Sequence, residues 1–103
     1  MAQFDVYASK DNNTAYPLLV DVQNELLHTL NTRLVIPLTP LTLIESTMPS
    51  TLCPILHLEQ GDFVLMTQFM SSMPTTALDT PIASISNFHD DIVRAVDLLI
   101  TGI

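Results

Sequence analysis

The 103-residue chain contains one cysteine, two glycines and no tryptophan. One cysteine excludes an intramolecular disulfide and a thiolate-rich zinc site, and it fits the reducing cytoplasm, where we expect the protein to act. Gly61 and Gly102 are too few for a glycine-rich phosphate loop. Hydrophobic residues make up 48% of the chain, enough for a core without metal or disulfide. The length predicts one domain over residues 1–103.

Basic residues are also scarce. Lys and Arg number 3 against 11 Asp and Glu, which gives a formal net charge of −8. Nucleic acids and anionic membranes attract clustered basic side chains, and Lys10, Arg33 and Arg94 are scattered. We therefore expect no direct binding to DNA, RNA or a membrane, and a basic protein segment is the better partner. No apolar run approaches the roughly 20 residues of a membrane-spanning helix.

Charged residues of either sign make up only 14% of the chain. Glu45 is the only one between Leu34 and Leu58, and residues 63–78 contain none. A small domain cannot bury all of this apolar sequence, so part of it is expected to form an interface, most simply in a homodimer. A surface rich in Thr, Ser, Asn and Gln is the alternative.

Alternating polar and apolar residues predict strands in the first part of the chain. Residues 3–8 place Phe4, Val6 and Ala8 on one face, and residues 16–22 form the second strand of an opening hairpin. A third strand is expected over residues 33–38, whereas residues 24–31 fit either a short helical turn or a loop. Two apolar runs, 52–58 and 63–67, flank a short loop with Gly61 and predict a second hairpin.

The C-terminal segment changes to helical spacing. Ser86 or Asn87 is the expected N-cap, Asp90 and Asp91 suit the positive end of the helix dipole, and Gly102 ends the helix. These patterns predict a mostly β, antiparallel domain closed by one C-terminal helix. The apolar residues of that helix share one side: Phe88, Ile92, Ala95, Val96, Leu99 and Ile103.

Catalytic chemistry finds little support in the residues. Cys53 lies in an apolar strand without a nearby cation to lower its pKa, so it is interpreted as a small buried side chain. Asp90 and Asp91 point about 100° apart on a helix and form no acid–base pair. No cofactor or metal is expected, and binding is favoured over catalysis. None of His28, His57 and His89 belongs to a metal-ligand spacing, and His57 is interpreted as a structural or surface side chain. A methionine cluster of Met66, Met70 and Met73 is interpreted as filling the core or a dimer interface.

Six segments in register give a resemblance to a known family. They are QFDVY at 3–7, LLVDVQ at 18–23, RLVIPL at 33–38, CPILHL at 53–58, MTQFMSSMP at 66–74 and DIVRAVDLLITGI at 91–103. Their order and spacing resemble the CcdB family of bacterial toxins from type II toxin–antitoxin modules. The resemblance covers the chain from end to end.

This resemblance implies a fold and a function. The family fold is a two-fold homodimer of SH3-like antiparallel barrels, each with a long C-terminal helix. Family members bind the A subunit of DNA gyrase and trap the enzyme while it is joined to cleaved DNA. A cognate CcdA-type antitoxin releases gyrase, and the toxin–antitoxin complex represses its own operon. The antitoxin supplies the DNA contacts, so the toxin meets DNA only through the antitoxin or gyrase.

The resemblance also implies site residues. The family ends in Trp-Gly-Ile, which carries poisoning, whereas this chain ends in Thr101, Gly102 and Ile103. Ile100 likewise replaces a frequent aromatic residue. Since the family tryptophan stacks on an arginine of gyrase, its loss suggests that recognition depends more on the flanking positions. The other implied contact positions are Gln3, Phe4, Tyr7, Asn24, Leu26 and Asp97.

Two alternatives remain beside a gyrase poison. A protein that binds antitoxin or gyrase but has lost poisoning activity would explain Thr101. A ribonuclease is the other alternative, because related toxins with this barrel cleave RNA. Such an enzyme needs basic groups to hold RNA and stabilise the transition state, and the few scattered cations argue against it.

Overall fold

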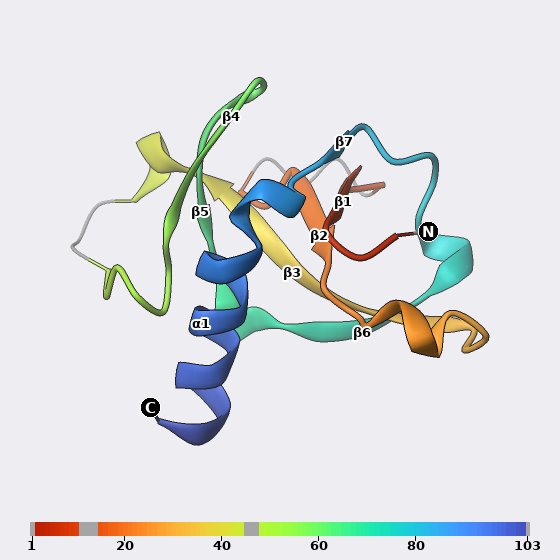
Figure 1. The fold of residues 1–103 in the computed structure, drawn as a ribbon. Coiled ribbons are helices and arrows are strands. Elements are labelled where there is room, and N and C mark those ends of the chain that lie inside the picture. Colours follow the sequence, from red (N-terminus) through yellow and green to blue (C-terminus); the bar gives the residue numbers. More distant parts are fainter. Residues whose placement is uncertain (1, 11–14, 45–47, 103) are drawn as a thin grey trace.

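A curled antiparallel sheet forms most of the protein in the computed structural model, which describes residues 2–10, 15–44 and 48–102 (Figure 1). Its strand order is β4-β5-β3-β2-β1-β7, and β6 pairs with β3 beside this path. The sheet forms an open half-barrel of SH3-like type, so the predicted mostly β class is confirmed. The strands are β1 (Asp5–Ala8), β2 (Leu18–Asp21), β3 (Thr32–Pro40), β4 (Ile55–Leu58), β5 (Gly61–Leu65), β6 (Ser71–Pro74) and β7 (Ala83–Ser84).

The long strand β3 organises the curl. Along one edge it pairs with β2, and along the other it pairs first with β6, through residues 32–35, and then with β5, through residues 38–40. Pro37 lies where β3 changes partner, so its missing N–H costs no ladder bond there. Its carbonyl accepts a hydrogen bond from the Met66 N–H at 3.0 Å. The proline is therefore compatible with a central strand.

Both predicted hairpins are present. β1 pairs with β2, and β4 pairs with β5 around the turn before Gly61, which has a left-handed φ of 131°. The undecided segment 24–31 contains a 3₁₀ turn, Glu25–Leu27. Further 3₁₀ turns of three residues follow β3, β5 and β6. The polar residues 10–14 predict the turn of the opening hairpin, and most of them lie outside the described residues.

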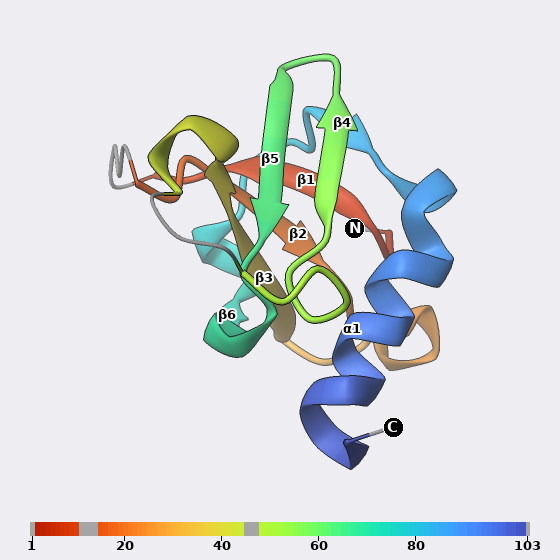
Figure 2. The same cartoon turned by 90° about the vertical axis from the view of Figure 1, so that its left-hand side faces the viewer.

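The helix α1 (His89–Thr101) packs across the open side of the half-barrel, and its last turns extend beyond the sheet (Figure 2). Ile92 and Ala95 are buried against the sheet, whereas Leu99 is exposed. The main core lies between α1 and the sheet and is built from Phe4, Val6, Leu18, Val20, Ile36, Leu38, Leu56, Phe63, Leu65, Ile85, Ile92 and Ala95. Among the described residues no helix is long and apolar enough to cross a bilayer.

The predicted start of α1 is wrong in detail. Ser86–Phe88 form a 3₁₀ turn that leads into the helix, and no side chain caps the first turn. Backbone bonds take the place of the expected Ser86 or Asn87 cap, because the Phe88 N–H donates to the Ile85 carbonyl at 2.9 Å. The predicted end is confirmed, since Gly102 follows the helix with φ 75°.

Two further expectations are corrected. Val6 lies in the main core, but Tyr7 is also buried and Ala8 is exposed, because both faces of β1 are covered at its centre. Tyr7 packs with Val35 and Leu78 in a second cluster. The methionines do not form one cluster. Met66 is buried with Cys53 and Val64, Met70 packs against the main core, and Met73 packs against the Tyr7 cluster.

Candidate functional site

The projecting end of α1 is the most exposed apolar part of the helix. Ile100 is 69% exposed, and Thr101 directs its hydroxyl back to the helix, where it donates to the Asp97 carbonyl at 2.6 Å. The Gly102 N–H donates to the Leu98 carbonyl at 3.0 Å. The last turn is therefore internally bonded, and Ile100 is its main apolar contact surface. Ile103, the remaining residue of the predicted tip, lies outside the described residues.

A small cleft runs beside α1, between the helix and the beginnings of β1 and the β2–β3 pair. Its volume is about 110 Å³. Three of the predicted contact residues, Gln3, Phe4 and Asp97, line this cleft together. The other lining residues are apolar: Val22, Leu34, Ile92, Val93 and Val96. The fold thus brings predicted contact positions from both ends of the sequence into one cleft.

Phe4, a buried residue of the cleft lining, has an unusual backbone conformation. Its φ of 69° lies in the left-handed region, which non-glycine residues seldom adopt. The backbone is fixed on both sides, because the Phe4 N–H donates to the Asp21 carbonyl and the Phe4 carbonyl accepts from the Ile85 N–H. The ring is nearly buried and meets His89 edge to face at 5.3 Å. Phe4 therefore shapes the site from below.

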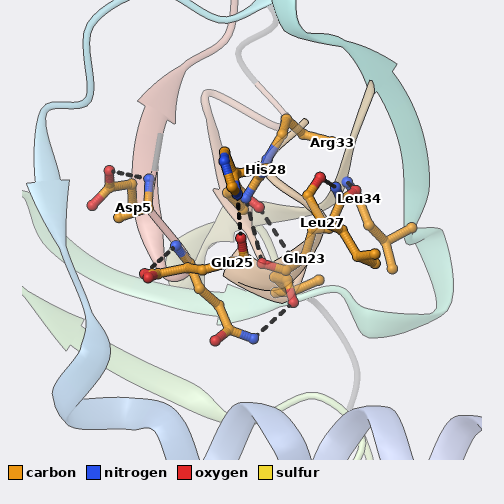
Figure 3. A network of polar contacts seen from close by, with 11 residues as sticks. Asp5, Gln23, Glu25, Leu27, His28, Arg33 and Leu34 are labelled. Atoms are coloured by element: carbon orange, nitrogen blue, oxygen red, sulfur yellow. Dashed lines mark hydrogen bonds and ion pairs between the residues drawn. The ribbon is translucent and has the colours of Figure 1, made fainter. Parts of the chain in front are cut away.

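The 3₁₀ turn after β2 presents Leu26. The Asn24 Oδ1 atom accepts a hydrogen bond from the Leu26 N–H at 2.8 Å, so Asn24 caps the turn, and Leu26 is 85% exposed. Gln3 connects the turn to the cleft: its N–H donates to the Glu25 carboxylate at 3.3 Å, and its side-chain amide donates to the Val22 carbonyl at 3.1 Å. Figure 3 shows the polar network around this turn.

A buried ion pair supports the turn from inside the protein. The Arg33 Nε atom donates to the Asp21 carboxylate at 2.7 Å, and both side chains are almost without exposed surface. Gln23 joins the pair, because its N–H donates to Asp21 at 3.0 Å and its side-chain oxygen accepts from the Leu34 N–H at 3.1 Å. Sequence reasoning missed this pair. The available signal was one Arg and one Asp in neighbouring predicted strands of a chain poor in charge.

Tyr7 is placed apart from the other predicted contact residues. Its side chain has no exposed surface, and its hydroxyl finds no hydrogen-bond partner among the described residues. Burial raises the pKa of the Tyr7 phenol, the charges of Asp5 and Asp21 raise it further, and Arg33 opposes them. Tyr7 can influence the surface only through the packing around it.

Charge on the site is negative and not neutralised within the described part of the chain. The three cations of the protein are engaged elsewhere: Lys10 with Asp79 at 3.2 Å, Arg33 with Asp21 at 2.7 Å and Arg94 with Asp91 at 3.8 Å. Asp97 and Glu25 are both exposed and have no ion-pair partner in the described ranges. The site is therefore an apolar surface with carboxylates at its edge that have no ion-pair partner among the described residues.

The surroundings of Cys53 and His57 do not favour a catalytic role. The Cys53 thiol is buried and donates to the Gln68 side chain at 3.2 Å, and burial raises the pKa of this thiol. A raised pKa disfavours the thiolate that a nucleophile needs. His57 is exposed and contacts Asp62 at 2.7 Å. Within residues 2–10, 15–44 and 48–102, no group of three or more His, Cys, Asp or Glu side chains could hold a metal.

The described residues thus form an SH3-like half-barrel domain with one projecting helix end and a small acidic-edged cleft. The model of the CcdB protein family matches residues 3–102. The chain therefore belongs to the CcdB family, and the resemblance seen in its sequence is confirmed. Its general function follows from this membership: it is a toxin of a type II toxin–antitoxin system.

Proposed function

We propose that this toxin binds the A subunit of DNA gyrase and traps the enzyme on cleaved DNA, acting by binding and not by catalysis. The exposed end of α1 carries this proposal. Gly102 turns the chain in a left-handed conformation directly after the helix, and Ile100 near this turn is 69% exposed. The nearby cleft adds Gln3 and Asp97 to this surface.

The predicted contact residues take three roles in this proposal, assigned by their exposure and by the contacts that they make. Leu26, Ile100, Thr101 and Asp97 are exposed and are proposed to contact gyrase, together with Gly102, Ile103 and Gln3. Phe4 and Asn24 are proposed to position them, since Phe4 forms the cleft floor and Asn24 caps the turn of Leu26. Tyr7 is buried and is proposed to support the site only through packing.

A gyrase cleavage assay tests the proposal. Supercoiled DNA, gyrase and ATP are incubated with the intact toxin or with a variant lacking Gly102 and Ile103. We expect linear DNA to accumulate with the intact toxin alone, because the variant lacks part of the proposed gyrase contact. The variant should still fold, because the deleted residues lie beyond α1 and leave the core in place. Thermal unfolding of the variant serves as the folding control. No linear DNA from the intact toxin, in an assay where a known gyrase poison gives linear DNA, would contradict poisoning.

We further propose that the toxin is a homodimer in the cytoplasm. The described residues leave ten large apolar side chains exposed, more than isolated surface positions explain: Leu26, Leu27, Leu30, Leu43, Ile55, Phe69, Ile82, Val93, Leu99 and Ile100. Some of this surface suits a second copy and some suits gyrase. Light scattering at micromolar concentration should give twice the mass of 11.4 kDa, and a monomer would contradict the dimer.

A CcdA-type antitoxin is the proposed neutralising partner and corepressor. With a net charge of −8, the toxin suits a tail rich in Lys or Arg, while the antitoxin supplies the DNA contacts. The association rate should fall as salt is raised from about 50 to 200 mM, because screening weakens attraction between exposed charges. A rate that is independent of salt would contradict this electrostatic picture.

A further inference from the structure

The cleft beside α1 has the size and the chemistry of a receptor for one side chain. Its volume of about 110 Å³ is well below the roughly 300–1,000 Å³ of small-molecule pockets. Its walls are formed by aliphatic side chains of α1 and of the β2–β3 region, with Phe4 below. An unbranched apolar stem is therefore the shape that it fits.

The edge of the cleft selects a positive charge. Asp97 belongs to the lining, and Glu25 is bonded to the backbone of Gln3, which also belongs to the lining. Both carboxylates are exposed, and the three cations of the chain are paired with other carboxylates. Nothing within the described protein thus neutralises this edge.

From these two features we infer that the cleft takes a lysine or arginine side chain of the protein partner, its stem between Val93 and Phe4 and its cation at Asp97. Lys and Arg are the side chains that combine an aliphatic stem with a cationic end. This inference rests on the proposed function, since the basic side chain is assigned to the gyrase A subunit. It gives Asp97 a role in specificity: the partner surface must place a cation next to the exposed Ile100.

Calorimetry with purified gyrase A subunit tests this role. Asp97→Asn keeps the size of the side chain and removes its charge, and we expect the affinity to fall at least tenfold at about 50 mM salt, with less loss at 200 mM. Asp90→Asn is the matched control, because Asp90 is an exposed carboxylate of the same helix outside the cleft lining. This control should change the affinity less than twofold.

A second variant tests the stem. Val93 lines the cleft and is only partly buried, so Val93→Phe should occupy the space without disturbing the core. We expect an affinity loss of about tenfold that is the same at both salt concentrations. Unfolding curves of both variants report whether the fold is intact.

The outcomes separate this inference from the proposed function. If the unmodified toxin fails to bind gyrase A, the proposed function fails and the assignment of the cleft fails with it. If the toxin binds but Asp97→Asn and Asp90→Asn behave alike, only the inference is overturned. If Asp97→Asn and Val93→Phe weaken the homodimer and leave the gyrase affinity unchanged, the inference is also overturned, because the cleft would then be occupied by a second copy of this chain.

Discussion

The interior beneath the site and the edge of the site contain the same kinds of residue in opposite situations. Asp21 is fully buried and paired with Arg33, whereas Asp97 is exposed without a cation in the described chain. Ile92 is buried in the main core, whereas Ile100, two helical turns later, is 69% exposed. The comparison shows that the first half of α1 contributes to the core, whereas its last turn is exposed, as the proposed gyrase contact requires. Variants that separate unfolding free energy from gyrase affinity can test this division.

The largest effect is expected at the buried ion pair. Arg33→Met leaves the Asp21 carboxylate buried without its cation, and breaking such a pair typically costs about 3–5 kcal/mol of unfolding free energy. Chemical denaturation measures the loss. The double variant with Asp21→Leu is the control and should recover part of it, because no buried charge remains. A loss below about 1 kcal/mol in Arg33→Met would show that the pair contributes little to the fold.

The second largest loss of stability is expected at Ile92, a core residue in the first half of α1. Ile92→Ala removes a side chain that is 1% exposed and leaves a cavity between the helix and the sheet, so about 2–5 kcal/mol of unfolding free energy should be lost. Leu99→Ala provides the matched comparison on the same helix, since Leu99 is 39% exposed. Equal losses in the two variants would contradict the division of α1 into two halves.

Tyr7 allows a smaller test of the interior. Its buried hydroxyl lacks a partner among the described residues, so Tyr7→Phe should raise the unfolding free energy by about 1 kcal/mol at pH 7. The raised pKa means that folding favours the protonated phenol. Stability should therefore be lost as the pH rises above the ordinary value of about 10, and Tyr7→Phe should lose less there. A destabilised Tyr7→Phe protein would indicate that the hydroxyl has a partner.

The sequence predicted the fold more fully than the burial of individual residues. Period-2 and period-3.6 patterns depend on local side-chain alternation, and they located the two hairpins, β3 and α1 with its end at Gly102. The same alternation placed Tyr7 on the face opposite Val6 but did not predict its burial, because segments distant in sequence cover both faces of β1. The cap of α1 was also missed, since a preceding 3₁₀ turn satisfies backbone groups that the pattern assigned to Ser86 or Asn87.

For the site, the resemblance supplied positions that the local pattern could not. Gln3 and Asp97 lie 94 residues apart and come together only because the segment before β1 and the helix α1 line the same cleft. The Asp21–Arg33 pair depends in the same way on the register between β2 and β3. Such contacts are tertiary, so they can be located only once the fold is known.

The smallest change in stability is expected at Ile100, together with a clear change in binding. An exposed side chain at the end of a helix adds little to the core, so Ile100→Ala should alter the unfolding free energy by no more than about 0.5 kcal/mol. Its gyrase affinity should nevertheless fall about tenfold, because truncating a central apolar contact of an interface typically costs more than 1 kcal/mol. Calorimetry with gyrase A measures the affinity, and Val93→Ala, which enlarges the cleft that Val93 lines, is the comparison variant with a smaller expected loss. If Ile100→Ala destabilised the protein as much as Ile92→Ala while gyrase affinity stayed unchanged, the last turn of α1 would belong to the core after all.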